Sequence, residues 1–185
     1  MSSANEQKIA LTSHVLDALQ FPLWGSRLIE ASAGTGKTWT IAALYLRLVL
    51  GQGGEQGFER PLMPPDILVM TFTRAATREL SDRIRHRLVE AVQCFRGEAE
   101  PAPFDNFLRE LRDGYAPGAE REHAAWRLDM AAQCMDDAAI HTIDAWCQRM
   151  LREHAFDSGN LFDEALEPDE SQRQMEAAQD YWRQQ

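Results

Sequence analysis

The chain has 185 residues, 44% of them hydrophobic, and a formal net charge of −10 at pH 7. This size suits one domain, or one domain and part of another. No apolar run approaches the roughly 20 residues that span a bilayer, and no basic, then apolar start indicates a secretory signal. The three cysteines are odd in number and lack zinc-site spacing, which is typical of a reduced cytoplasmic protein.

The charge is unevenly distributed. Residues 1–97 carry 11 Lys and Arg against 9 Asp and Glu, whereas residues 98–185 carry 8 against 20. The net negative charge disfavours a protein that coats nucleic acid through bulk electrostatics. We therefore expect any contact with a polyanion in the first half, and solvent or a protein partner at the acidic half.

The first predicted unit is a short strand over residues 27–31 and a helix over residues 37–50. Between them, "ASAGTGKT" fits the phosphate-loop pattern G-x-x-x-x-G-K-[ST], with Ala31 at the first glycine. Backbone N–H groups that open onto a helix N-terminus suit a nucleotide phosphate chain. Lys37 is expected at the β- and γ-phosphates, and the Thr38 hydroxyl at Mg²⁺. The alternative is a glycine-rich turn that binds nothing. The predicted nucleotide site consists of Ala31, Ser32, Ala33, Gly34, Thr35, Gly36, Lys37 and Thr38.

The second predicted unit is a strand over residues 67–72 and a helix over residues 74–95. The stretch "TFTRAATREL" starts where the strand ends, at the sheet edge where ligands gather in open α/β folds. Thr73 can cap the helix or help to hold a phosphate. Phe72 could support an unstacked base, although taken alone it is expected in the core and the arginines of the helix on a solvated face.

The third predicted unit is a strand over residues 139–143 and a helix over residues 145–156, with Asp144 as its N-cap. Helices are also expected over residues 104–112, 120–134 and from 168 onward. The last helix carries Met175, Tyr181 and Trp182 on one side and lacks a stop signal, which favours a truncated chain over a helix that folds back. Strands that alternate with helices predict an α/β fold with a parallel sheet and helices on both faces.

Together the three motifs resemble those of superfamily-one DNA helicases: "ASAGTGKT" their first motif, "TFTRAATREL" the next and "HTIDAWCQRML" the short third one. More specifically, the chain resembles the RecB-type family, the beta subunits of exodeoxyribonuclease V. The segments that carry this resemblance are "RLIEASAGTGKT" followed by "TIAALYLRL", and "HAFDSGNLFDEALEPDES". It covers nearly the whole chain from Phe21 onward. It implies ATP and Mg²⁺ as cofactors, DNA ends unwound 3′ to 5′ with nuclease action for recombinational repair, and the gamma and alpha subunits as partners.

The resemblance also implies a domain division and a set of DNA contacts. The fold would be a P-loop NTPase (RecA-like) sheet, incomplete, with a mostly helical insertion. Its divisions would be an N-terminal extension (1–20), the P-loop core of the first helicase lobe (21–95), a helical insertion (96–135), a continuation of the core (136–157) and the truncated start of a helical subdomain (158–185). The DNA-binding residues would be Phe72, Thr73, Arg74 and Thr142, and Thr38 would bind Mg²⁺.

Two positions depart from the family pattern. Asp144 occupies the place of a histidine, and a carboxylate at a helix N-terminus repels DNA phosphate. Trp24 stands near the place of the glutamine that reads adenine, where it permits stacking but not amide recognition. Hydrolysis also needs a Mg²⁺-binding acid on a strand end, and Asp163 and Glu164 follow a poor strand. No complete catalytic set is therefore expected, so the chain should bind ATP without turning it over.

Two alternatives remain open from the residues themselves. A self-contained small-molecule kinase would use the same loop with residues 97–119 as a lid, which offers only Arg109 and Arg112. A non-catalytic module would dock a partner through its acidic half and carry a vestigial loop. No membrane contact is expected under any of these hypotheses.

Overall fold

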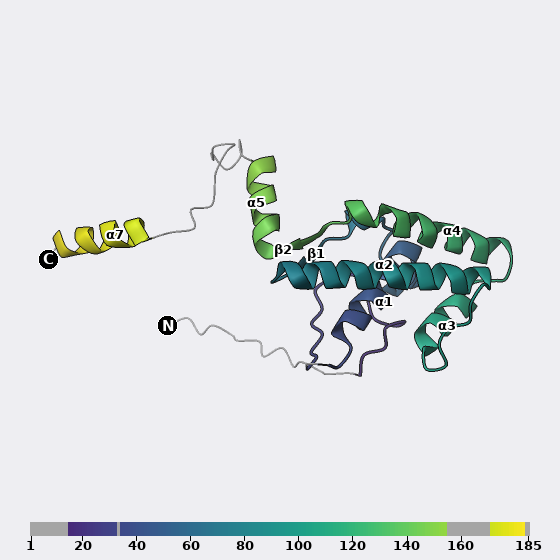
Figure 1. Ribbon diagram of the computed structural model, residues 1–185. Coiled ribbons are helices and arrows are strands. Elements are labelled where there is room, and N and C mark those ends of the chain that lie inside the picture. Colours follow the sequence, from purple (N-terminus) through teal and green to yellow (C-terminus); the bar gives the residue numbers. More distant parts are fainter. Residues whose placement is uncertain (1–14, 33, 155–170, 184–185) are drawn as a thin grey trace, which may run out of the picture. The chain divides into compact units, whose positions relative to one another are not determined.

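The computed structural model describes residues 15–32, 34–154 and 171–183 (Figure 1). The chain forms two compact units, which divide between Thr142 and Ile143. The first unit contains α1 (Lys37–Leu50), η1 (Gly54–Gln56), η2 (Pro64–Asp66), β1 (Val69–Thr71), α2 (Arg74–Arg96), α3 (Asn106–Asp113), α4 (Ala119–Gln133), η3 (Cys134–Asp137) and β2 (Ile140–Thr142). The second contains α5 (Ile143–Glu153) and α7 (Ser171–Arg183).

The sheet of the first unit consists of β1 and β2, which run parallel. Val69, Met70 and Thr71 lie opposite Ile140, His141 and Thr142. Parallel strands need a long crossover, which here contains α2, α3 and α4. The second and third strands predicted from the sequence are thus confirmed, each shorter than expected.

The strand predicted over residues 27–31 is wrong. The structure describes residues 27–31 in full, and they form no strand. Leu28 is 77% exposed, although it is apolar. A strand is stable when neighbouring strands satisfy its N–H and C=O groups, and the described sheet does not pair with this segment. A RecA-like sheet therefore remains a prediction.

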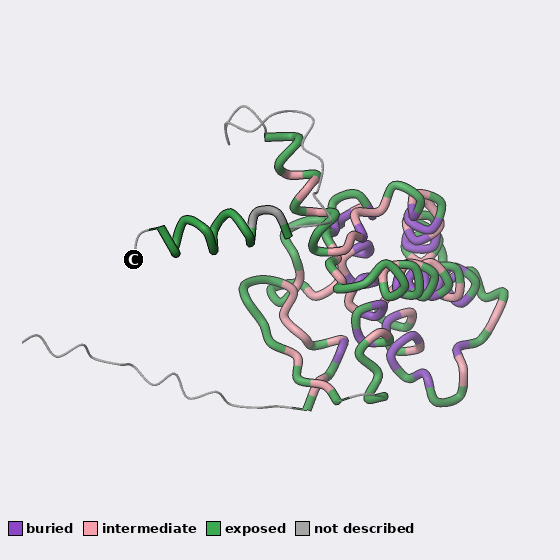
Figure 2. The backbone as a smooth tube through the Cα atoms, turned by 60° about the vertical axis from the view of Figure 1, so that its left-hand side comes forward, coloured by how far each residue is buried: buried purple, intermediate pink, exposed green. Residues whose placement is uncertain are grey.

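The core of the first unit lies between α1, α2 and α4, which contact one another. Figure 2 shows buried residues along the facing sides of these helices. Thr73 caps α2, because its hydroxyl accepts a hydrogen bond from the Ala76 N–H at 3.1 Å, and Gly97 ends the helix at a φ of 74°. Leu88 of α2 and Leu128 of α4 are fully buried, and each such side chain stabilises the fold by about 2 kcal/mol.

The two helices predicted between the second and third units are α3 and α4, and a buried ion pair connects α3 to α2. Arg87, predicted to be solvated, is buried and donates to the carboxylate of Asp105. Asp105 also caps α3, because it accepts from the Leu108 N–H at 3.1 Å. Burial opposes ionisation of Asp105, but the hydrogen bonds from Arg87 and Leu108 outweigh it and lower the pKa of this carboxyl group.

Aromatic rings extend this contact to α1. The ring of Trp39, in the first turn of α1, meets the edge of Phe107 of α3 with centroids 5.5 Å apart. The guanidinium of Arg87 lies 5.8 Å from the Trp39 ring and 5.7 Å from the Phe107 ring. Helix α3 is therefore packed against α1, the helix that follows the predicted phosphate loop.

In the second unit, α5 begins at Ile143, directly after β2. Asp144 therefore lies in the first turn of the helix and is not its N-cap, which corrects the prediction. The helix predicted from residue 168 is confirmed as α7, with Met175, Tyr181 and Trp182 exposed. Asp163 and Glu164 lie outside the described residues. Among the described helices, none is both long and apolar enough to cross a bilayer.

Candidate functional site

The predicted phosphate loop closes around the ammonium group of Lys37. Its Nζ atom donates to the carbonyl oxygens of Ala31 at 3.0 Å and Ser32 at 2.6 Å. The Thr35 hydroxyl also donates to the Ser32 carbonyl, at 2.8 Å. The loop thus holds its own cation beside the start of α1. Ala33 lies outside the described residues.

Two glycines give the loop its curvature. Gly34 has a φ of 77° and Gly36, at the N-cap of α1, has a φ of 88°. Residues with a Cβ rarely adopt this left-handed region. Open space surrounds both glycines, so the loop backbone is accessible on its outer side.

The N-terminus of α1 offers unused donors. The first hydrogen bond of the helix runs from the Thr40 N–H to the Gly36 carbonyl at 2.8 Å, and no acceptor within the described residues reaches the N–H groups of Thr38 and Trp39. No side chain caps this end, and no acidic residue lies in its first turn. Because the helix dipole favours an anion here, this end of α1 fits a phosphate group.

The residues present fit a polyphosphate chain accompanied by a hard cation. Lys37 supplies the charge, the amides supply the donors, and the Thr38 hydroxyl makes no hydrogen bond within the described part of the chain. Mg²⁺ commonly binds through a few protein oxygens, water and substrate phosphates. The described residues contain no cluster of three or more His, Cys, Asp or Glu side chains that could hold a metal by itself.

Trp24 lies on the segment before the loop. Its indole N–H donates to the Glu55 carbonyl at 3.2 Å, and the Arg27 guanidinium lies 5.3 Å from its ring. The side chain is 53% exposed. The ring is therefore fixed at one edge while part of its surface stays accessible, which agrees with stacking but gives no amide for reading a base.

At the end of β1, Phe72 is 88% exposed, so its predicted place in the core is wrong. Threonines position this turn: the hydroxyls of Thr71 and Thr77 lie 2.6 Å apart, and each lies 3.1 Å from the Thr73 carbonyl oxygen. Sequence reasoning missed the role of Thr71 and Thr77, although the spacing of threonines in "TFTRAAT" was a usable signal. The network stabilises a turn that presents an aromatic ring to solvent.

The first turn of α2 adds positive charge beside Phe72. Arg74 begins this helix, which has no acidic residue in its first turn. Neither Arg74 nor Arg78 has a carboxylate partner among the described residues. Cations near a helix N-terminus interact unfavourably with the helix dipole. These arginines therefore do not stabilise α2, and their positive charge suits an external anion.

The sheet register brings two of the predicted DNA-binding segments together. Thr71 lies directly opposite Thr142, at the last position of both strands. Phe72, Thr73 and Arg74 leave this edge after β1, and the chain continues into α5 after Thr142. The same edge therefore carries all four predicted DNA-binding residues. The phosphate loop does not pair with this sheet, so a shared edge for loop and sheet stays a prediction.

Comparison with known proteins identifies the family. A family model, the UvrD/REP helicase N-terminal domain, matches residues 11–185. The chain belongs to this helicase family. The resemblance to RecB-type helicases predicted from the sequence is confirmed by relatives named "RecBCD enzyme subunit RecB".

Three such relatives show the range of similarity. The protein of Escherichia coli (strain K12) is 48% identical over 92% of this chain, and that of Haemophilus influenzae 44% over 91%. The protein of Mycobacterium tuberculosis (strain ATCC 25618 / H37Rv) is 34% identical over 75% of this chain. The matched regions cover 14%, 14% and 12% of these relatives. The chain thus spans about a seventh of their length.

Proposed function

We propose that this chain forms the ATP-binding part, and one DNA-contacting edge, of a RecB-type helicase subunit. The complete subunit would use ATP and Mg²⁺ to unwind double-stranded DNA ends 3′ to 5′, with associated nuclease activity, in recombinational repair. It would work in the cytoplasm with a gamma and an alpha subunit. The observation that carries the proposal is the phosphate loop, in which Lys37 lies at an α1 N-terminus that has free amides and no acidic residue.

Within this proposal, each side chain has a distinct task. Lys37 and the loop amides bind and orient the phosphates of ATP, and Thr38 contributes its hydroxyl to Mg²⁺, which neutralises charge on the phosphates. Phe72 stacks on a base of single-stranded DNA. Thr73, Arg74 and Thr142 position the DNA backbone, because phosphate contacts fix the register of a strand without reading its sequence.

The kinase alternative loses support from the insertion. Arg112 donates to Glu100 and Asp113, both at 3.0 Å. Arg109 donates to Asn106 and to carbonyl groups of the same insertion. Both arginines of the supposed lid are therefore engaged within residues 96–135, which weakens the case for their use on a phosphate at the loop.

Thermal unfolding with ATP and Mg²⁺ tests the proposal and the vestigial-loop alternative together. Ligand at 100 times its dissociation constant adds about 2.7 kcal/mol of stability to a protein that binds it. We expect this stabilisation in the native chain and its loss in Lys37→Ala. An unchanged melting temperature at millimolar nucleotide would contradict the proposal and favour the vestigial loop.

We also propose that the chain alone does not turn ATP over, because arginines from a second lobe complete such sites. Phosphate release should stay at background with and without single-stranded DNA. Steady release that Lys37→Ala abolishes would show that the site is complete within these 185 residues.

A further inference from the structure

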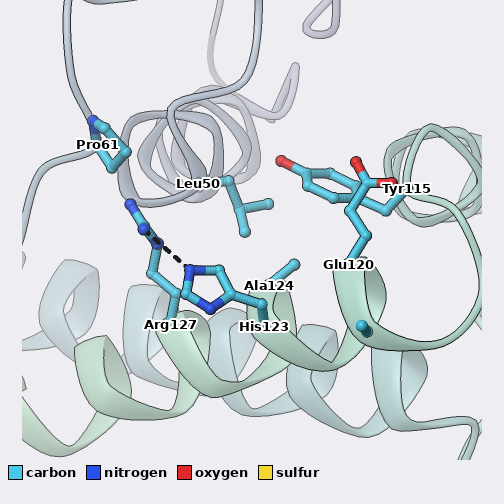
Figure 3. A pocket seen from close by; sticks show the side chains of 8 residues that line it. Leu50, Pro61, Tyr115, Glu120, His123, Ala124 and Arg127 are labelled. Carbon is cyan, nitrogen blue, oxygen red and sulfur yellow. Dashed lines mark hydrogen bonds between the residues drawn. The ribbon is translucent and has the colours of Figure 1, made fainter.

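A cavity of about 420 Å³ lies in the first unit at the C-terminal end of α1 (Figure 3). Leu50 of α1, Pro61 of the following loop and Tyr115 before α4 form its walls, and α4 forms its floor. Leu50 is the last residue of the 14-residue helix α1 and Lys37 is the first, so about 20 Å of helix separates the cavity from the phosphate loop. The cavity is a site distinct from the proposed nucleotide site.

One face of α4 lines this cavity. Glu120, His123, Ala124 and Arg127 all contribute to the lining, and their spacing of three and four residues places them on one side of a helix. Ala124 is buried at the middle of this face. Glu120 and Arg127 are two turns apart, which is about 10 Å along the helix. The face therefore carries opposite charges at its two ends.

The basic end has an unused cation. The Arg127 guanidinium lies 3.3 Å from the His123 ring, and no carboxylate within the described residues pairs with it. By contrast, Asp129, which also lies on α4, pairs with Arg96 of α2 at 2.9 Å. The Tyr115 hydroxyl also has no hydrogen-bond partner in the described part of the chain, and Figure 3 shows it directed toward Leu50. The cavity thus offers donors for an acidic group.

The acidic end is only partly engaged. Glu120 accepts a hydrogen bond from the Ala116 N–H through Oε2 at 3.0 Å, which leaves its other carboxylate oxygen for a cation or an N–H group. Leu50, Pro61 and Ala124 supply apolar surface along the cavity. The arrangement is complementary to a molecule with a basic group, an apolar group and an acidic group in that order.

The walls are fixed without a ligand. Pro61 lies so close to Gly51 that a Cβ there would come within 2.7 Å of Pro61 Cγ, and the Leu62 N–H donates to the Leu48 carbonyl at 2.9 Å. The Tyr115 ring packs edge-on against Phe95 at 5.4 Å. A rigid cavity loses little conformational entropy when it binds a ligand.

The surface beside the cavity favours a polypeptide over a small metabolite. Trp126 is 55% exposed, and its ring lies 5.8 Å from that of His123. Trp126 and Arg127 are neighbours on α4, and exposed aromatic rings and arginines are enriched in protein–protein contacts. In an extended peptide, alternate side chains share one face and residues advance about 3.3 Å each, so positions 1 and 5 lie about 13 Å apart. Long charged side chains at these positions can bend inward to reach Glu120 and Arg127, about 10 Å apart along the helix.

We propose that this cavity docks an extended peptide segment of a partner protein, with the pattern basic–x–apolar–x–acidic in either chain direction. The apolar side chain contacts Leu50 and Ala124. The acidic side chain binds Arg127 and His123, and the basic side chain binds Glu120. This site is independent of the proposed nucleotide and DNA sites.

Titration of the ¹⁵N-labelled chain with two synthetic peptides tests the proposal. The probes are acetyl-Lys-Thr-Leu-Thr-Glu-amide and its reverse, acetyl-Glu-Thr-Leu-Thr-Lys-amide. We expect one of them to shift the amide resonances of residues 115–127 and 50–62 with a dissociation constant of about 1 mM or lower. Replacing Glu by Gln in the peptide should weaken binding about fivefold, because it removes the ion pair with Arg127.

Matched variants separate this binding from general charge effects. Arg127→Gln and Glu120→Gln should each weaken binding about fivefold, whereas the exposed Arg83→Gln and Glu122→Gln should leave it within twofold. Ala119→Phe, which fills the cavity from an exposed lining position, should abolish binding while the remaining spectrum stays native. Absent shifts with both peptides at about 10 mM, or equal binding by Ala119→Phe, would overturn the proposal. So would self-association of the chain that Arg127→Gln removes, since the occupant would then be a second copy.

Discussion

The Nζ atom of Lys37 lies 2.6 Å from the carbonyl oxygen of Ser32. This contact holds the loop and the Lys37 ammonium group together. Because the side chain is exposed, the ammonium group can exchange the carbonyl oxygens for phosphate oxygens with little loss of free energy. We expect Lys37→Ala to change the free energy of unfolding by about 0.5 kcal/mol or less, as exposed substitutions do. Urea unfolding of the native chain and of Lys37→Ala measures this difference in the free energy of unfolding. A loss of about 2 kcal/mol or more would show that Lys37 serves mainly to stabilise the fold.

The exposed ring of Phe72 gives a second prediction. Phe72→Ala should weaken binding of a fluorescent oligothymidylate by about 1–3 kcal/mol, because a base loses its stacking partner. Phe104 is also 88% exposed but lies just before α3 and follows neither strand, so Phe104→Ala is the matched control and should leave the affinity unchanged. Fluorescence anisotropy at low salt measures both. Equal effects of the two substitutions would exclude a specific role for Phe72.

The pair of Arg87 and Asp105 gives a third prediction. Asp105→Asn should lower the free energy of unfolding by about 3 kcal/mol, because it leaves a buried guanidinium without its full partner. Asp113→Asn, where the carboxylate is 54% exposed and Arg112 keeps Glu100 as a second partner, should cost less than about 1 kcal/mol.

The same pair makes stability depend on pH. The pKa of Asp105 is lowered in the folded protein, so its contribution is complete above the ordinary carboxyl pKa of about 3.9 and is lost as the pH falls through the lower folded value. The stability difference between the native chain and Asp105→Asn should therefore be constant from neutral pH down to about pH 5 and shrink below pH 4. A difference that persists unchanged in acid would contradict this assignment.

The cysteines give a fourth prediction. Cys94 is buried and Cys147 is exposed, and burial raises the pKa of the Cys94 thiol. A thiol reagent should modify Cys147 rapidly in the native protein and Cys94 only in denaturant, since the reactive species is an accessible thiolate. Mass mapping after brief labelling checks the order. Labelling of Cys94 at the rate of Cys147 would mean that the packing of α2 opens readily.

The sequence predicts local structure well where each residue's neighbours decide it. Thr73 and Gly97 end α2 through capping chemistry, and the glycines of the phosphate loop dictate its curvature, so these features could be predicted. The segment with Leu28 could not, because a strand forms only where other strands pair with it. The exposure of Phe72 could not be predicted for a similar reason. An apolar residue at a strand end suits either the core or a binding surface, and the threonine network that fixes this turn decides between the two.

Helices α3 and α4 show the same limit. They follow from apolar spacing, but the contact of Trp39 with Phe107 of α3 joins residues far apart in the chain. Likewise, the cavity beside Tyr115 depends on where the end of α1 meets α4. Nothing in the local pattern of either segment specifies the other.

Isothermal titration of the 185-residue chain with ATP and Mg²⁺ is the decisive measurement of nucleotide binding at the loop. We expect one saturable site whose binding heat disappears in Lys37→Ala, while the urea unfolding of that variant stays close to native. Absence of binding heat at millimolar nucleotide, or an isotherm that Lys37→Ala leaves unchanged, would contradict it.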